Sequence, residues 1–202
     1  MPSERNIPQV AKRLFIRDGV VRLRDFEAQG IARAQVARWA EAGTLQRVGR
    51  GLYALPGMDL GEHEGIVRAA KLVPAGIVCL LSALQVHQMT TQNPSEVWLG
   101  IPRNARRPQL SWPPLRLVWW SGAALVAGVV HTKLARVSVR VTSPARTIAD
   151  CFKHRSLVGL DVAIEALREY RRGRRGTLDE LHQMASACRV TRVIQPYLEA
   201  VV

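Results

Sequence analysis

The chain has 202 residues, 48% of them hydrophobic and 22% charged, which excludes a disordered polypeptide and suffices for one generous core or two small ones. The formal net charge of +13 predicts attraction to a polyanion, with nucleic acid favoured over an acidic membrane surface. Three well-separated cysteines, Cys79, Cys151 and Cys188, form no C-x-x-C pair, so neither a disulfide framework nor a zinc cluster is expected.

These features predict a cytoplasmic protein that holds no metal or cofactor and does not associate with membranes. The longest apolar stretch, residues 72–84, contains Pro74 and Gly76 and is too short to span a bilayer. Arginine supplies most of the positive charge, but arginine content also follows genome base composition and is weak evidence by itself.

The first sixty residues predict three helices. Apolar residues at helical spacing indicate a helix over 8–17, and a short second segment over 23–28 ends at Gly30. A third helix is predicted over 32–43, with Val36, Trp39 and Ala40 on a buried stripe. The place of Trp39 on that stripe favours a core role over base stacking.

Residues 44–57 predict a hairpin of two short strands with a basic tip. Its centre is Gly49-Arg50-Gly51, whose glycines can adopt the positive φ of a tight turn. Pro56-Gly57 and the residues up to Gly61 form the best candidate linker.

The chain beyond the linker predicts strands followed by helices. A helix is expected over 62–73, then a strand over 77–81, a helix capped by Ser82, and a helical end that begins at Ser143-Pro144. Thr177 has the spacing of a capping box with Glu180. Further strands are predicted over 97–101, 115–120 and 137–141, and further helices over 157–172 and from 177; the state of 121–130 stays open.

The predicted fold class is therefore α+β: an N-terminal winged helix-turn-helix over 1–57, followed by a mixed α/β domain over 62–202 with a helical C-terminal end. Three helices followed by a two-stranded ribbon are typical of a winged helix-turn-helix.

This arrangement predicts a DNA-binding surface on the third helix and the wing. The third helix would reach base edges in the major groove, and the wing would reach phosphates or the minor groove. The flanking basic residues would contact the DNA backbone. The alternative is a winged helix that binds protein, with arginines that are merely solvated. The candidate DNA-binding residues are Lys12, Arg22, Arg24, Arg33, Gln35, Arg38, Arg47 and Arg50.

A second group of arginines comes in two parts, at 102–108 and 168–176. Such runs are usually solvated helix or loop residues, and basic residues at a helix C-terminus complement its dipole. A second DNA-contacting surface is the alternative. The candidate members of this second basic surface are Arg103, Arg106, Arg107, Arg171, Arg172, Arg174 and Arg175.

Enzymatic motifs are lacking in the sequence, and we expect no catalytic residues. His63-Glu64 has no partner histidine at the zinc-protease spacing, and no phosphate-binding glycine loop is present. From Pro102 to Ala149 there is no Asp or Glu, whereas a metal-dependent nuclease needs clustered carboxylates.

The segment GVVRLRDFEAQGIARAQVARWAEAGTLQRVGRGLYALPG, at 19–57, resembles the winged-helix domain of the AbiEi-type antitoxins of type IV abortive-infection systems. VTSPARTIADCFKHRSLVGLDVAIEAL at 141–167 and RVTRVIQPYLEA at 189–200 resemble the C-terminal part of that family. Ala32 departs from the pattern, because the usual capping hydroxyl is absent there.

The resemblance implies a repressor that binds inverted repeats in its own promoter. It also implies that the C-terminal domain antagonises a partner nucleotidyltransferase toxin without forming a stable complex with it. Two alternatives stay open: a stand-alone transcription factor with an effector-binding C-terminal module, and a DNA endonuclease, because similar N-terminal domains occur joined to endonuclease-like domains.

Overall fold

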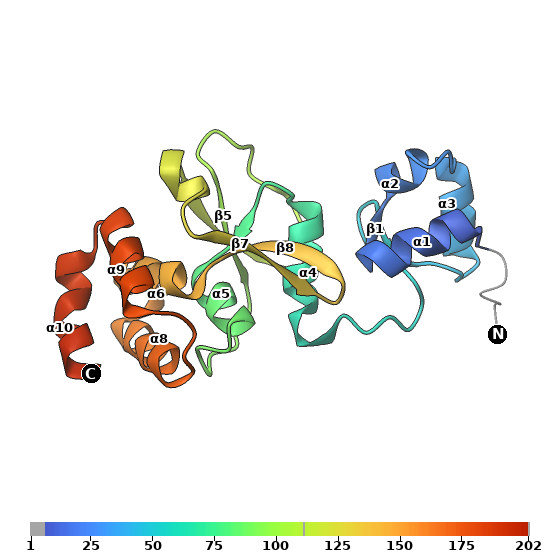
Figure 1. The fold of residues 1–202 in the computed structure, drawn as a ribbon. Coiled ribbons are helices and arrows are strands. Elements are labelled where there is room, and N and C mark those ends of the chain that lie inside the picture. The colour runs from blue at the N-terminus through green and yellow to red at the C-terminus, as the bar shows by residue number, and fades with distance from the viewer. Residues whose placement is uncertain (1–6, 111, 202) are drawn as a thin grey trace. The chain divides into compact units, whose positions relative to one another are not determined.

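The computed structural model describes residues 7–110 and 112–201 (Figure 1). The chain forms two compact units. The first unit extends to Pro74 and includes Lys133–Val139, and the second comprises Ala75–Thr132 and the chain from Arg140 onward. The domain boundary expected between residues 57 and 62 stays a prediction.

The N-terminal part of the first unit has the order of elements that the sequence predicts, with one strand added. Its elements are α1 (Gln9–Asp18), β1 (Val21–Arg22), α2 (Leu23–Glu27), α3 (Arg33–Glu41), β2 (Gln46–Gly49) and β3 (Leu52–Ala54). The three strands form an antiparallel sheet in the order β1-β3-β2. Strand β1 has only two residues, too few for a sequence pattern, and its pairing with β3 defines it.

Aromatic side chains hold this part together. The ring of Phe26 lies 5.7 Å from that of Phe15 and 6.1 Å from that of Tyr53, with tilted and edge-on geometries that aromatic pairs prefer. Val36 and Trp39 of α3 are buried in the same cluster. The core thus fixes which side of α3 faces inward.

The first unit continues with a short 3-10 helix, η2 (Gly61–His63), and α4 (Glu64–Leu72). Arg68 on α4 pairs with Glu64 one turn earlier and donates a 2.6 Å hydrogen bond from Nη1 to the carbonyl of Val48 on β2. The helix predicted over 62–73 is therefore present, and it packs in the same unit as the wing.

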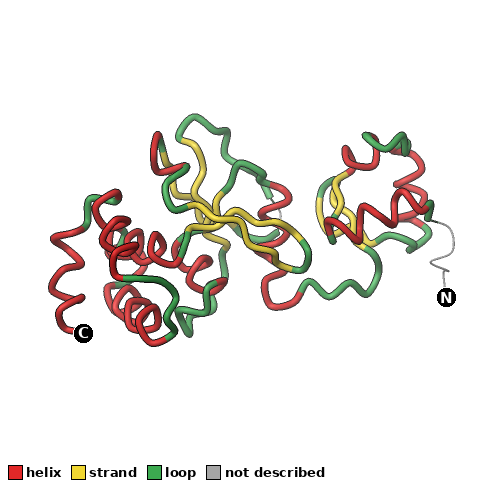
Figure 2. The backbone as a smooth tube through the Cα atoms, in the orientation of Figure 1, coloured by secondary structure: helices red, strands yellow, loops and turns green. Residues whose placement is uncertain are grey.

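A five-stranded mixed sheet follows, with the order β6-β5-β4-β8-β7. Strand β4 pairs antiparallel with β5 and parallel with β8, and β5 pairs parallel with β6. Figure 2 shows the strands in yellow and the helices in red. The strands are β4 (Ile77–Val78), β5 (Val97–Pro102), β6 (Leu115–Trp120), β7 (Val129–Leu134) and β8 (Val137–Thr142).

Three local predictions in this region need correction or completion. The strand expected over 77–81 ends at Val78, because α5 (Leu80–Val86) begins two residues later. Ser82 lies inside α5 and is not its N-cap; its buried Oγ accepts a 3.0 Å hydrogen bond from the backbone N–H of Trp98. The undecided segment 121–130 contains a 3-10 helix, η3 (Gly122–Leu125), and the start of β7.

The C-terminal end of the chain is helical, as predicted. Ser143 caps its first helix by accepting a hydrogen bond from the N–H of Arg146, and Thr177 forms the predicted capping box with Glu180. The helices are α6 (Pro144–Lys153), α7 (Arg155–Val158), α8 (Leu160–Arg172), α9 (Leu178–Ala187) and α10 (Thr191–Val201). The chain is thus an α+β protein whose N-terminal part has the elements of a winged helix-turn-helix.

A buried ion pair lies within the apolar core of the second unit. Arg146 is 3% exposed and its Nε donates to Oδ2 of Asp150, 1% exposed, at 2.8 Å. Its Nη1 donates to the carbonyl of Ala127 at 2.7 Å, and its guanidinium lies 5.1 Å from the centre of the Trp120 ring. Arg146 therefore ties α6 to β6 and to the chain before β7.

Candidate nucleic-acid interface

Helix α3 presents its basic side chains to solvent because its apolar stripe is committed to the core. Val36 and Trp39 are buried, whereas Arg33 and Arg38 are exposed and Gln35 is half-buried. The N-cap residue, Ala32, offers no side-chain acceptor, as its chemistry requires. The first turn of α3 therefore begins with N–H groups that a phosphate could satisfy.

The wing is a hairpin whose tip carries exposed arginines. Arg47 on β2 and Arg50 at the tip are both exposed, and the Nε of Arg47 lies 3.4 Å from the carbonyl oxygen of Gly49. Of the two glycines expected to adopt positive φ, only Gly51 does, at +66°. Gly49 instead lies at a register shift in the β2–β3 ladder, and an added Cβ there would come within 3.5 Å of the Leu52 side chain.

The other three candidates differ in how available their charges are. Lys12 on α1 and Arg24 on α2 are exposed, and Arg24 lies 3.8 Å from the carboxylate of its neighbour Asp25. Arg22 is half-buried, and its Nε donates a 2.7 Å hydrogen bond to the carbonyl of Lys71. That hydrogen bond gives the Arg22 guanidinium a structural role, and burial lowers its pKa.

The second group of arginines comes from two separate segments. Arg103, Arg106 and Arg107 are exposed in the loop after β5, whereas the other members lie at and beyond the end of α8. Figure 1 shows that loop beyond the ends of the strands, and α8 among the C-terminal helices. Of the members near α8, Arg171 is half-buried, Arg172 pairs with Glu169 at 2.9 Å, Arg174 is exposed, and Arg175 lies 3.4 Å from Gln88.

The three cysteine side chains are buried in the core. Cys79 and Cys151 are fully buried, and burial raises the pKa of both thiols. The Sγ of Cys188 lies 3.5 Å from Oδ1 of Asp150, and burial raises its pKa to about 11. At neutral pH these thiols are protonated and act as small apolar core groups.

No cluster of three or more His, Cys, Asp or Glu side chains suited to hold a metal ion occurs among residues 7–110 and 112–201. Nor does any helix in these ranges combine the length and the apolar character needed to cross a bilayer.

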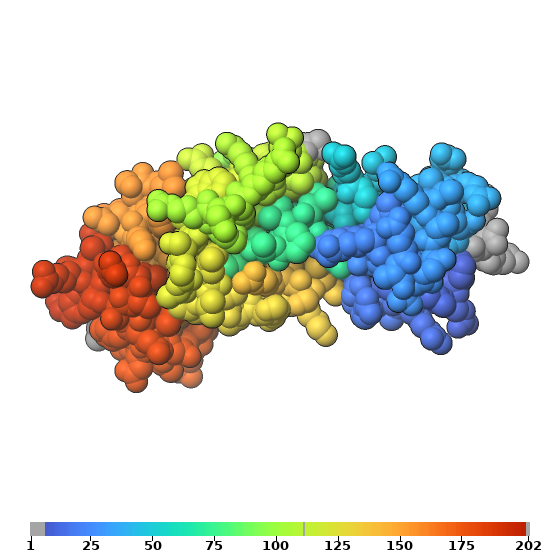
Figure 3. Space-filling model, turned by 90° about the horizontal axis from the view of Figure 1, so that it is seen from above, coloured from blue at the N-terminus to red at the C-terminus, as the bar shows by residue number. Residues whose placement is uncertain are grey.

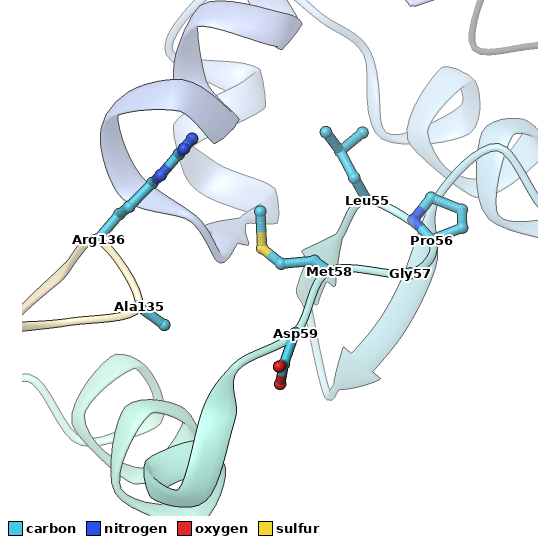
Figure 4. Close-up of a pocket in the computed structure, with 7 residues that line it drawn as sticks. All are labelled: Leu55, Pro56, Gly57, Met58, Asp59, Ala135 and Arg136. Carbon is cyan, nitrogen blue, oxygen red and sulfur yellow. The ribbon is translucent and has the colours of Figure 1, made fainter.

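A pocket of about 330 Å³ lies in the first unit beside the turn that follows the wing. It is lined by residues 55–59 and by Ala135 and Arg136 at the β7–β8 turn, and its side chains are shown in Figure 4. Asp59 points away from Arg136, so the cation stands without an ion-pairing partner among the residues drawn. Apart from Asp59 and Arg136, the pocket is lined by apolar side chains and backbone groups, a set that indicates no particular class of ligand.

Two features that support the candidate interface were not predicted from the sequence. Arg68 supports the wing through the carbonyl of Val48, and its only signal is the i, i+4 spacing from Glu64. Strand β1 places Arg22 beside Leu52 of the wing, a pairing that two residues of sequence cannot reveal.

A helix with exposed arginines, next to a basic hairpin on a three-helix core, defines the winged helix-turn-helix class of regulatory domains. Residues 9–56 match the family of transcriptional regulators described as AbiEi antitoxin, which confirms the expected resemblance over that segment. This is a family of regulatory antitoxins.

The solved structure of the RV2827C protein from Mycobacterium tuberculosis is similar to this chain, with a TM-score of 0.57 and 15% sequence identity. The match covers 90% of this chain and 73% of that one, and at this identity it shows a shared fold. No curated protein sequence matches the chain.

Proposed function

We propose that this protein binds double-stranded DNA in its own promoter, at inverted repeats, and represses its operon. The observation that carries the proposal is the exposure of Arg33 and Arg38 on α3, beside Arg47 and Arg50 on the wing, while Val36 and Trp39 are buried. The match of residues 9–56 to a family of transcriptional regulators supports the same conclusion.

The two elements have different tasks in this proposal. An α-helix fits the major groove, where an arginine donates two hydrogen bonds to a guanine edge and so reads sequence. The wing contacts phosphates or the minor groove, which adds affinity that depends on salt but little on sequence. Arg38 is therefore assigned to base reading, and Arg50 to the backbone.

The proposal extends to antitoxin activity. The family match over residues 9–56 supports an antitoxin role in general. We further propose that the toxin is a nucleotidyltransferase, which the C-terminal part antagonises without forming a stable complex with it. Co-expression with the product of an adjacent nucleotidyltransferase-like reading frame should restore growth, and the two proteins should not co-purify. If growth is not restored, the antitoxin role is refuted, and the alternative of a stand-alone transcription factor is favoured.

The experiment that tests DNA binding is a shift assay with the DNA upstream of the gene and a scrambled duplex. Arg38→Ala should weaken operator binding by about 1–3 kcal/mol and leave scrambled binding nearly unchanged. Arg50→Ala should weaken both duplexes alike. Arg192→Ala, which removes an exposed charge from α10, is the matched control and should change neither.

Wild-type affinity of both Arg38→Ala and Arg50→Ala would refute the assigned surface. Incubation of the protein with plasmid and magnesium should leave the plasmid intact, since the proposed function is binding. Metal-dependent cleavage that copurifies with the protein would favour the endonuclease alternative.

A further inference from the structure

Two adjacent tryptophans on β6 point to opposite faces of the sheet. The ring of Trp120 is buried against Gly100, where an added Cβ would overlap it, and the guanidinium of Arg146 lies over the same ring. Because side chains alternate along a strand, Trp119 must point the other way, and it is 43% exposed. The exposed indole is thus held outward by the packing of its neighbour.

Strand β6 is an edge strand of the five-stranded sheet and pairs with β5 on one side. Trp119 lies opposite Ile101 in that ladder, and Pro102 lies opposite Trp120. The backbone N–H of Arg103, the first residue after β5, donates a 2.8 Å hydrogen bond to the carbonyl of Trp120. The exposed Arg103 therefore lies next to the last residue of β6, which directly follows Trp119 in the chain.

The loop after β5 places more positive charge at this end of the sheet. A turn closed by the N–H of Ala105 and the carbonyl of Pro102, 2.9 Å apart, leads directly to Arg106 and Arg107, which are exposed. Figure 3 shows this stretch, in yellow-green, standing at the molecular surface. The sequence has no acidic residue between Glu96 and Asp150, so the loop and strand carry no compensating charge of their own.

We propose that Trp119 and the adjacent loop form a second binding surface, which takes an unpaired nucleic-acid strand. A base stacks on the Trp119 indole, and the strand's phosphates pair with the arginines of the loop. This β6 surface consists of Trp119, Arg103, Arg106 and Arg107.

The chemistry favours a single strand over the alternatives. In a duplex the base faces are stacked on one another, so an exposed indole on a sheet finds a stacking partner only in an unpaired base. An acidic protein would satisfy the arginines but would leave the indole without a matching planar group. The β6 surface differs in this from the wing and α3, whose proposed ligand is duplex DNA.

The test measures fluorescence anisotropy of labelled 12-nucleotide strands with the full-length protein. Mixed-sequence single-stranded RNA, the same sequence as single-stranded DNA, and its duplex are the probes, and the ratio of the first two identifies the sugar preference. Wild-type protein should bind a single strand in either form. Trp119→Ala should weaken that binding by about 5- to 150-fold, the range for loss of one stacked base.

Conservative and matched variants distinguish stacking from general charge. Trp119→Phe should recover most of the lost affinity, because a phenyl ring still stacks. Arg106→Ala combined with Arg107→Ala should weaken single-strand binding and flatten its salt dependence. The same double change at Arg172 and Arg174, at the end of α8, should weaken it much less.

These variants test the two proposed binding surfaces independently of each other. Trp119→Ala should leave operator-duplex affinity unchanged, whereas Arg38→Ala should leave single-strand affinity unchanged. The β6 surface is refuted if Trp119→Ala binds single strands as tightly as wild type, or if Arg172 and Arg174 matter as much as Arg106 and Arg107. Competition by polyglutamate at the same charge concentration as RNA would also overturn it, in favour of an acidic protein partner.

Discussion

The Arg146–Asp150 pair offers the sharpest test of how the second unit is held together. Both side chains are almost completely buried, and the guanidinium also donates to the Ala127 carbonyl and covers Trp120. Removing one member of a buried pair leaves an uncompensated charge or an unsatisfied donor, which costs about 3–5 kcal/mol. We therefore expect Arg146→Met and Asp150→Asn each to reduce the free energy of unfolding by this amount.

The two variants should differ in their response to pH. Burial already raises the pKa of Asp150, and Arg146 acts in the opposite direction, so Arg146→Met should raise this pKa further. A carboxyl with a higher pKa in the folded than in the unfolded state binds its proton more tightly when folded. Stability of Arg146→Met should therefore rise as the pH falls from 8 to 5, whereas Asp150→Asn, which lacks the carboxyl, should show no such gain.

Urea unfolding followed by circular dichroism at pH 8 and pH 5 measures both effects. The double variant Arg146→Met/Asp150→Asn should lose less stability than the two single losses added together, with a coupling of about 0.5–3 kcal/mol. Arg172→Met is the matched control, because its 2.9 Å pair with Glu169 is exposed and contributes at most about 1 kcal/mol. Additive single losses, together with a pH-independent Arg146→Met, would refute the reasoning.

Three further predictions concern the wing, a histidine and a cap. The double variant Arg47→Ala/Arg50→Ala should have a shallower slope of log affinity against log salt concentration for duplex DNA, by an amount that corresponds to about one to two lost phosphate contacts. The slope is measured from affinities at several salt concentrations. An unchanged slope would mean that neither side chain contacts the DNA phosphates. The Nε2 of His87 lies 2.6 Å from the Thr142 carbonyl, and burial lowers the pKa of this imidazole. The unfolded chain therefore binds the proton more tightly than the folded one, and the protein should lose stability as the pH falls below the unfolded pKa of about 6.5. His87→Gln should flatten that loss in urea titrations between pH 7.5 and 5.5, and an equally steep loss in the variant would assign it elsewhere. Thr177→Ala should cost about 1 kcal/mol in the same unfolding assay, since it removes the cap of α9, and a cost near zero would mean that this helix end is satisfied without it.

Local rules in the sequence determined most of the elements. Helical spacing with Gly30 and Gly43 predicted α3, and the fixed chemistry of Ser143-Pro144 and Thr177 predicted where α6 and α9 begin. These features act within one or two turns of chain, so no distant contact is needed to read them. The same spacing put Trp39 on the inner side of α3, which the structure confirms.

Long-range contacts decided what the sequence could not. Strand β1 exists because Val21 and Arg22 pair with β3. Ser82 lies inside α5, and its hydroxyl accepts a hydrogen bond from the N–H of Trp98, sixteen residues away. The hydrogen bond from Arg22 to the carbonyl of Lys71 likewise joins residues that are 49 positions apart in the chain.

The two tryptophans of β6 show the division most clearly. Sequence alternation says that Trp119 and Trp120 point opposite ways, but it cannot say which one is buried. Only the packing decides this, because Gly100 leaves room for one indole and the buried Arg146 covers its ring. The sequence therefore determined that the two indoles lie on opposite faces of the sheet. The space beside Gly100 and the buried guanidinium of Arg146 determined that Trp120 is the buried one.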